Sequence, residues 1–210
     1  MTNTFLVAQK EVRFSKDSDT AVWYGYKNNY ARQFKLGLIE NDTTDYSFRF
    51  WSFGLIIKVT SKANQSSGEI IRFVETYPNS KNKKIFTKRY SISPSKAMQV
   101  RYLIDSMQIE VLPSDKSIAG WQHGFDGIEY FTEYKKGREY SFKNYWTPTS
   151  QDTLKEAIQF QNFVSSLDRI LNLKNNSKKF QADIPFDSWT YPGSGTNVLR
   201  IKPKLKKNGG

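Results

Sequence analysis

Residues 46–60, which read YSFRFWSFGLIIKVT, place the strongest constraint on the fold of this chain. In an extended conformation their side chains alternate between two faces, with Tyr46 and Phe48 on one face and Arg49 and Trp51 on the other. Flat aromatic rings fit the pleated, half-buried surface of a sheet. The run therefore predicts a strand, and with it a sheet that the rest of the chain must cover.

The same pattern predicts further extended segments along the chain. Gly54 marks a bulge or bend in the first run. Residues 69–77 are expected to return as its antiparallel partner, and residues 127–146 to form a hairpin around Lys135–Arg138. The other predicted strands are residues 21–27, 180–186 and 196–201.

Two amphipathic helices are predicted. The first begins where Ser93 can cap and Pro94 occupies the first helical position, and it continues through residues 95–107. The second covers about residues 153–173 and has a wide apolar face. A face of that width is expected to lie on a sheet.

The order of these elements predicts an α+β fold, with mainly antiparallel sheet of aromatic-rich strands packed by two amphipathic helices. Strands and helices do not alternate regularly, which argues against a parallel sheet. A boundary near residues 113–120 predicts two domains, residues 1–115 with the first strands and helix, and residues 116–210 with the hairpin, helix, final strands and basic tail. A single domain is the alternative.

Composition excludes several kinds of chemistry. The chain of 210 residues has no cysteine and one histidine, so Cys-ligated zinc, thiol catalysis and multi-histidine sites are excluded. We expect no metal, no cofactor and no catalytic residue. No apolar run has membrane-spanning length, so we expect no membrane insertion and a soluble, cytoplasmic protein. The alternative is an exported protein whose signal peptide is absent from this chain.

The only histidine lies in residues 120–130, GWQHGFDGIEY. His123, Asp126 and Glu129 are the residue types of a general base with orienting acids. However, the chain offers no nucleophile in a recognised setting and no second histidine. An Asp-Gly pair beside aromatic residues is more typical of a turn, in which Gly127 is free to adopt a positive φ. We therefore predict a structural turn that begins a strand.

The second hairpin is rich in aromatic side chains, and alternation places some of them on an exposed face. Tyrosine and tryptophan often anchor protein contacts. We therefore predict a binding surface for another protein that consists of Tyr130, Tyr134, Tyr140, Tyr145 and Trp146.

The net charge of +12 raises the alternative of a nucleic-acid partner, because a basic surface releases counterions when it meets phosphate. The basic residues gather in two segments without acids, which are expected to be loop or tail. The predicted basic patch consists of Lys81, Lys83, Lys84, Lys88, Arg89, Lys204, Lys206 and Lys207.

The chain ends in Gly209-Gly210 after a basic stretch, which is similar to the ends of ubiquitin-like modifiers. That resemblance implies conjugation through Gly210 and a β-grasp domain from about Gly127 onward. The leading hypothesis from the sequence is a non-enzymatic protein-interaction module. A ubiquitin-like modifier and a nucleic-acid-binding protein are the alternatives.

Overall fold

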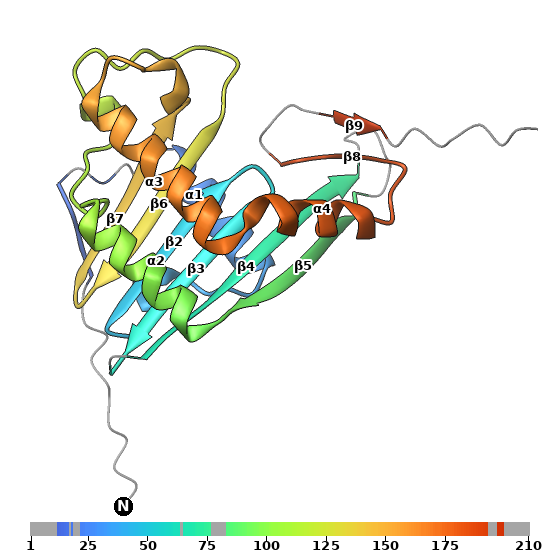
Figure 1. Ribbon diagram of the computed structural model, residues 1–210, viewed down its shortest axis with the longest axis horizontal. Helices are drawn as coiled ribbons and strands as arrows, with labels where there is room; N and C mark the ends of the chain where they lie inside the picture. The colour runs from blue at the N-terminus through green and yellow to red at the C-terminus, as the bar shows by residue number, and fades with distance from the viewer. Residues whose placement is uncertain are drawn as a thin grey trace, which may run out of the picture.

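The structure is a computed structural model that describes residues 12–16, 18, 22–63, 65–76, 83–192 and 197–199. In this part of the chain, nine strands form one sheet, in which every pairing except that of the first strand is antiparallel (Figure 1). Four helices pack on the sheet. The expected α+β class with a mainly antiparallel sheet is confirmed.

The sheet follows the order β1-β7-β6-β2-β3-β4-β8-β9, and β5 also pairs with β4. β2 pairs with β3 on one side and with β6 on the other, so strands from both halves of the chain lie side by side. The strands are β1 Arg13–Phe14, β2 Tyr46–Ser52, β3 Leu55–Lys62, β4 Gln65–Thr76, β5 Ile85–Ile92, β6 Glu129–Lys136, β7 Glu139–Trp146, β8 Ser188–Thr190 and β9 Asn197–Leu199.

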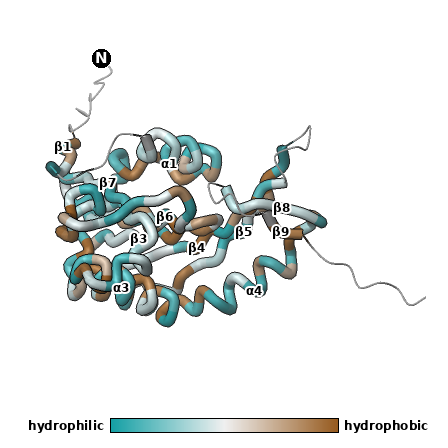
Figure 2. Tube along the Cα trace, turned by 90° about the horizontal axis from the view of Figure 1, so that it is seen from above, coloured by the Kyte–Doolittle hydropathy of each residue, from teal (hydrophilic) through white to brown (hydrophobic). Residues whose placement is uncertain are grey.

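The helices cover both faces of the sheet. α2, α3 and α4 lie on one face (Figure 1), and α1 lies on the opposite face, which gives three layers in the view from above (Figure 2). Three short 3-10 turns, η1 to η3, connect the elements. The helical segments are α1 Val22–Gln33, η1 Ile39–Asn41, α2 Pro94–Ser106, η2 Asp115–Ser117, η3 Pro148–Ser150, α3 Lys155–Leu171 and α4 Leu173–Asp183.

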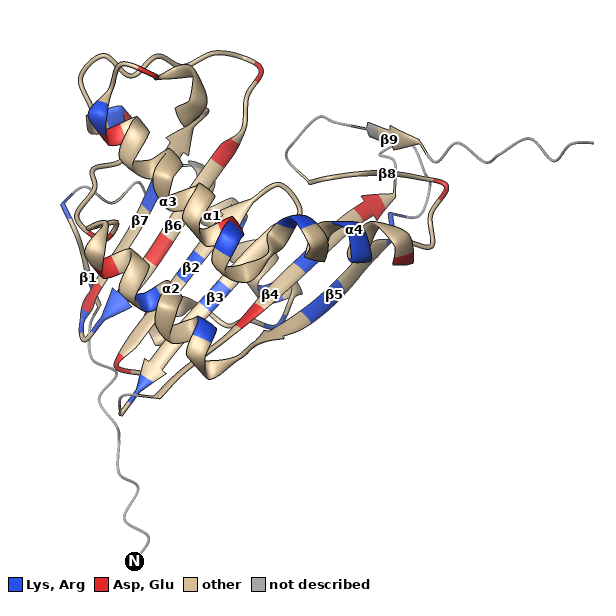
Figure 3. Ribbon diagram, in the orientation of Figure 1, with Lys and Arg blue, Asp and Glu red and all other residues tan. Residues whose placement is uncertain are grey.

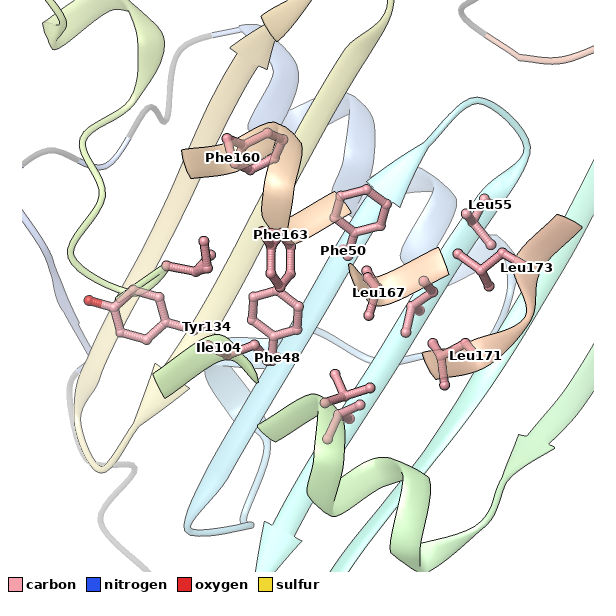
Figure 4. Packing of buried hydrophobic residues seen from close by; sticks show 14 of the residues in the cluster. Phe48, Phe50, Leu55, Ile104, Tyr134, Phe160, Phe163, Leu167, Leu171 and Leu173 are labelled. Atoms are coloured by element: carbon pink, nitrogen blue, oxygen red, sulfur yellow. The ribbon is translucent and has the colours of Figure 1, made fainter. Parts of the chain in front are cut away.

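The larger apolar core lies between the sheet and the helices α2 and α3. The alternation of β2 turns Phe48 and Phe50 toward this layer, where both rings meet Phe163 of α3 edge-on (Figure 4). Phe160, one turn earlier on α3, stacks on Tyr145 of β7 with ring centroids 3.9 Å apart. These contacts explain why the apolar face of α3 had to be wide.

The opposite face of the sheet packs on α1 and on the segment that follows it. Ala31 and Phe34 of this region are buried against Phe73, Trp51 and Phe131 of the sheet. A third, smaller cluster at the far end joins Phe180 and Ile184 to Val74 and Trp189. The sheet is therefore buried on both faces over its central strands.

Two strand predictions are wrong, because each segment is helical. Residues 21–27 were expected to be extended, but Val22–Gln33 forms α1. Its buried positions Lys27 and Asn28 are followed at three or four residues by Ala31 and, directly after the helix, by Phe34, which is the helical period. Packing therefore overrides the strand preference of the aromatic rings.

Residues 180–186 were also expected to be extended, but α4 continues to Asp183. Phe180 and Ile184 are buried four residues apart on its inner side. Asn172 separates α3 from α4. Its φ is 54°, in the left-handed region that asparagine tolerates. The helix end predicted near residue 173 is therefore a break between two consecutive helices.

Gly54 lies in a tight turn and not in a bulge. Residues 46–60 form two strands that fold back on each other, with Ser52 opposite Leu55. The φ of Gly54 is 62°, and a Cβ there would approach the carbonyl oxygen of Phe73 to 2.6 Å. Residues 69–76 do return as the antiparallel partner, because β4 pairs with β3, and residue 77 of the predicted segment lies outside the described residues.

Candidate functional site

Helix α2 begins as the sequence predicts. The side chain of Ser93 accepts a hydrogen bond from the backbone N–H of Lys96 at 3.4 Å, and Pro94 occupies the first turn. Ala97, Val100 and Ile104 are buried against the sheet. The opposite side of the same helix therefore faces solvent.

That outer side carries two large apolar residues four positions apart. Met98 is 59% exposed and Tyr102 is 73% exposed. They line a shallow groove between α2 and α3 together with small polar and part-buried apolar residues, and we call it the α2 groove. Its described lining residues are Ser95, Met98, Gln99, Tyr102, Leu103, Ser106 and Ile170.

None of these described lining residues carries a charge, although a quarter of the chain is charged. Two of the three charged residues of α2, Arg101 and Asp105, form ion pairs within the chain. Arg101 pairs with Asp105 at 2.7 Å and with Glu110 at 2.6 Å, and its guanidinium lies over the ring of Tyr46. The α2 groove is therefore an uncharged patch on a basic protein.

The predicted aromatic surface is mainly core. Tyr134, Tyr140 and Tyr145 are buried, because β6 and β7 lie inside the sheet and both of its faces are covered. The hydroxyl of Tyr145 donates to the carbonyl of Leu112 at 3.1 Å. These three tyrosines cannot contact a partner from the folded surface, which corrects that part of the prediction.

The other two residues of this set, Tyr130 and Trp146, are partly exposed. Tyr130 lines a cavity of about 100 Å³ with Phe160 and Val164. Ligand pockets for small organic molecules usually hold about 300–1,000 Å³. This cavity is therefore too small for a ligand of that class.

Three of the four described residues of the basic patch are engaged within the chain. Lys83 pairs with Glu75, Lys88 with Asp183 and Arg89 with Glu69, each at 2.6 Å. Segments bearing Lys and Arg alternate with acidic ones along this side of the sheet and α4 (Figure 3).

Part of the patch was expected to be loop, but residues 85–92 form the strand β5, which pairs with β4. Lys84 is exposed just before that strand. The remaining residues of the predicted patch and of the predicted conjugation site lie outside the described residues, namely Lys81, Lys204, Lys206, Lys207, Gly209 and Gly210.

The loop with the only histidine bends at residues 125–126 before β6 begins at Glu129. Nε2 of His123 lies 3.1 Å from Oδ2 of the buried Asp115, which also accepts the backbone N–H of Trp146 at 2.7 Å. Asp115 therefore ties this loop to the end of β7.

Gly127 is required in this loop for space. It is not among the positive-φ glycines of the structure, contrary to the expectation for a turn. A Cβ at this position would approach the indole ring of Trp146 to 2.6 Å, and the next amide, of Ile128, donates to the hydroxyl of Thr147 at 2.8 Å. The loop thus packs flat against the end of the hairpin.

A second cluster of polar groups lies beneath α1. Glu133 is fully buried and accepts hydrogen bonds from the indole N–H of Trp51 and from the hydroxyl of Tyr140. Burial raises the pKa of Glu133 above its ordinary value. Arg49, its neighbour across β2 and β6, donates to the carbonyls of Leu36 and Gly37 at 3.0 Å.

Among the described residues, no group of three or more His, Asp and Glu side chains is placed to hold a metal ion. In the same part of the chain, no helix is both long and apolar enough to cross a membrane.

Sequence reasoning missed the α2 groove. The predicted amphipathic character of this helix accounts for its buried side but assigns no role to Met98 and Tyr102 on the other side. Their spacing of four residues, off the buried stripe, is the signal that was present in the sequence. No family model matches this chain, and searches of curated proteins and of solved structures found no match.

Proposed function

We propose that this protein is a non-enzymatic interaction module that binds another protein through the α2 groove. The observation that carries the proposal is the uncharged lining of the groove around Met98 and Tyr102, on a chain with a net charge of +12. The centres of protein interfaces are depleted in charged residues and enriched in tyrosine and methionine. The partner surface that fits is an apolar, uncharged segment of a second protein.

A nucleic-acid partner is less well supported. The described basic residues Lys83, Lys88 and Arg89 are each paired with a carboxylate of the same chain. Phosphate binding would have to replace these pairs. The proposed groove offers no cation to phosphate, so binding there is expected to persist at high salt, whereas phosphate contacts weaken steeply with salt.

Photo-crosslinking tests the proposal directly. A photoreactive phenylalanine analogue at position 102 is compared with the same analogue at position 125, where Phe125 is also a large, fully exposed aromatic residue outside the groove. We expect one polypeptide to crosslink at position 102 and not at position 125, in buffer with 0.5 M salt and nuclease. Equal crosslinking at both positions, or none at position 102, would refute the assignment.

Substitutions give an independent test with matched variants. Met98→Ser combined with Tyr102→Ser is expected to abolish capture of that polypeptide, whereas Phe125→Ser retains it. Interface anchors of this size typically contribute about 2 kcal/mol or more each, so a loss of 30-fold or more in affinity is expected for the double variant. If Phe125→Ser loses capture and the double variant does not, the interface is the loop at residues 121–128 and not the α2 groove.

A further inference from the structure

A hollow at the edge of the sheet gathers cations from two distant parts of the chain. It lies where β1 meets the β6–β7 turn, and its volume is about 610 Å³. Figure 3 shows segments of Lys and Arg at this meeting point. We call it the β1 hollow. The cations that line it are Arg13, Lys16, Lys136 and Arg138.

Backbone hydrogen bonds hold the two segments of the β1 hollow together. β1 runs parallel to β7, with Arg13 opposite Glu139. The amide of Arg13 donates to the carbonyl of Arg138 at 2.9 Å, and the amide of Ser15 donates to that of Tyr140 at 2.8 Å. The backbone that carries the cations is therefore in place before any ligand arrives.

The cations of the β1 hollow differ from those of the basic patch in how they are paired. The three engaged residues of that patch each lie 2.6 Å from a carboxylate. By contrast, Arg13, Lys16 and Arg138 are exposed and form no ion pair with a carboxylate in the part of the chain that the structure describes. Lys136 is 60% exposed and reaches Glu110 only at 4.0 Å. Most of the charge in the hollow is thus open to a ligand.

The lining of the β1 hollow carries a surplus of three positive charges, because Glu139 is the one acid among its four described cations. Like charges in one hollow raise the local potential, and a bound anion relieves their repulsion. Arginine binds phosphate through its fork of N–H donors, and lysine binds it as a point charge. The volume falls in the range of about 300–1,000 Å³ that is typical of small-molecule sites.

The surroundings of the hollow favour a compact anion over an extended nucleic-acid strand. Glu110 lies beside Lys136, and the carbonyl of Asp45 accepts the amide of Gly137 in the β6–β7 turn at 3.5 Å. These acidic residues interrupt the basic surface next to the hollow. A nucleic-acid strand needs a basic groove that follows its backbone over several nucleotides.

We propose that the β1 hollow binds a compact anion with two or more phosphate groups, as in a polyphosphate chain or the phosphate chain of a nucleotide. Arg13, Lys16 and Arg138 supply the unpaired charged donors, and Lys136 adds a fourth. The hollow shares no described lining residue with the α2 groove, so the two sites are independent.

Calorimetric titration of the whole protein with inorganic tripolyphosphate tests the proposal. The salt concentration is kept at about 50 mM, where charge interactions are only moderately screened. The hollow variant is Arg13→Gln/Lys16→Gln/Arg138→Gln. Its matched control is Lys83→Gln/Lys88→Gln/Lys155→Gln, which removes three cations that each pair with a carboxylate elsewhere. Both variants lower the net charge of +12 by three, so a difference between them reports where the charge lies.

We expect the parent protein to bind tripolyphosphate and the hollow variant to bind it at least about tenfold more weakly, because three exposed charge contacts are lost together. The control variant should lose less than about threefold. An equal loss in both variants would mean that the anion responds to net charge alone, and no binding to the parent protein would equally overturn the proposal. The hollow variant should unfold at the same or a higher temperature without ligand, since repulsion is reduced.

Glu139→Gln tests the position of the site without the loss of a cation. This variant raises the surplus of positive charge in the lining, so we expect tripolyphosphate to bind about threefold more tightly or better. Glu156→Gln, which removes a carboxylate outside the hollow, should leave the affinity unchanged. Unchanged affinity in Glu139→Gln would show that the anion binds elsewhere.

Three further ligands define the anion. ATP without added magnesium should bind as tightly as tripolyphosphate if the phosphate chain alone is recognised, and more tightly if the ligand is a nucleotide. Orthophosphate should bind at least about tenfold more weakly than tripolyphosphate, because it meets fewer of the cations. Equal affinity for orthophosphate would contradict a site for several phosphate groups. Binding of a short single-stranded DNA, without binding of tripolyphosphate, would assign the hollow to nucleic acid instead.

Discussion

The two faces of the sheet are covered in physically different ways. Under α2 and α3 the centre of the interface is apolar, with rings and aliphatic side chains interdigitating around Phe163. Outside that centre, two buried cations of the sheet reach separate backbone sites, Lys143 at the carbonyls of Glu110 and Leu112 and Arg72 at the carbonyl of Leu173. Under α1, by contrast, cations from several strands converge on the one segment that follows the helix. Both layers therefore combine burial of apolar area with directional hydrogen bonds, and they differ in how far those bonds are concentrated on one segment.

The directional contacts on the α1 face share one pattern, in which a cation on a strand donates to a group of residues 34–42. Arg49 of β2 reaches two carbonyls, and Lys58 of β3 pairs with Asp42 at 3.5 Å. Arg89 of β5 donates to the carbonyl of Phe34, and Lys135 of β6 donates to that of Asp42. Four strands thus fix one irregular segment, which has little regular structure of its own.

This difference indicates how each layer is specified. Apolar packing stabilises α3 strongly but allows many side chains to be exchanged if volume is kept. Hydrogen bonds from fixed cations require the segment at residues 34–42 to follow one path, because each cation has a defined carbonyl or carboxylate as its acceptor. Substitutions on the two faces should therefore differ in both the size and the extent of their effects.

Phe163→Ala is expected to have the largest effect. The ring is fully buried and contacts Phe48, Phe50 and Phe160, so its removal leaves a cavity in the centre of the core. We expect the free energy of unfolding to fall by about 3–5 kcal/mol, measured by urea denaturation. The partly exposed Ile158 on the same helix provides the control, since Ile158→Ala should change it by less than about 1 kcal/mol. Equal losses would show that α3 is not packed as described.

Arg49→Met tests the other face and is expected to cost less. The substitution removes two hydrogen bonds to Leu36 and Gly37, but it also removes Nε and Nη1, which are buried without a partner among the described residues. We expect a loss of about 2–3 kcal/mol.

The pattern of hydrogen exchange in Arg49→Met separates the two mechanisms of packing. Amides near residues 34–42 should exchange faster in this variant, whereas those of α3 should change only by the global loss of stability. Arg138→Met serves as a control at an exposed position of the β6–β7 turn. If amide exchange is accelerated equally in both layers, Arg49 does not act locally on residues 34–42.

The parts of the fold that the sequence predicted correctly have local signals. Ser93 and Pro94 mark the start of α2 by themselves, and the alternation of residues 46–52 marks β2. The start of α1 has no such mark, because its aromatic residues favour strands and only packing against Phe73 and Phe131 selects the helix. The strand β5 was not predicted, because a run of basic residues without acids is typical of a loop. The acidic residues that pair with this run, Asp183 and Glu69, lie elsewhere in the sequence.

The candidate sites were less accessible to sequence reasoning. The aromatic residues of β6 and β7 alternate as predicted, but alternation alone does not tell whether the second face is covered. Tyr140 is buried only because α1 and β1 lie nearby, and neither was predicted in its observed form. The sequence likewise offered no signal for the environment of Lys27, because its position over the ring of Phe131 depends on the packing of α1.

Lys27→Met is expected to have the smallest effect, and one of opposite sign. In the folded protein the pKa of Lys27 is about 8, below its ordinary value of 10.5, so the unfolded chain binds this proton more tightly. Below pH 8 the folded state therefore bears the full cost of a buried ammonium. That cost fades as pH rises from 8 to 10.5, which means that stability from this group increases over that interval.

Methionine has a similar length and no charge, so it removes this cost together with the weaker attraction of the ammonium to the rings. At pH 7 we expect Lys27→Met to be more stable than the parent protein by about 2 kcal/mol in urea denaturation, and the gain should shrink as pH rises above 8. Lys155→Met, at an exposed position, should show neither the gain nor its pH dependence. A variant that is destabilised at pH 7 would mean that the ammonium of Lys27 contributes net stability. The buried charge under α1 would then stabilise that face of the sheet instead of weakening it.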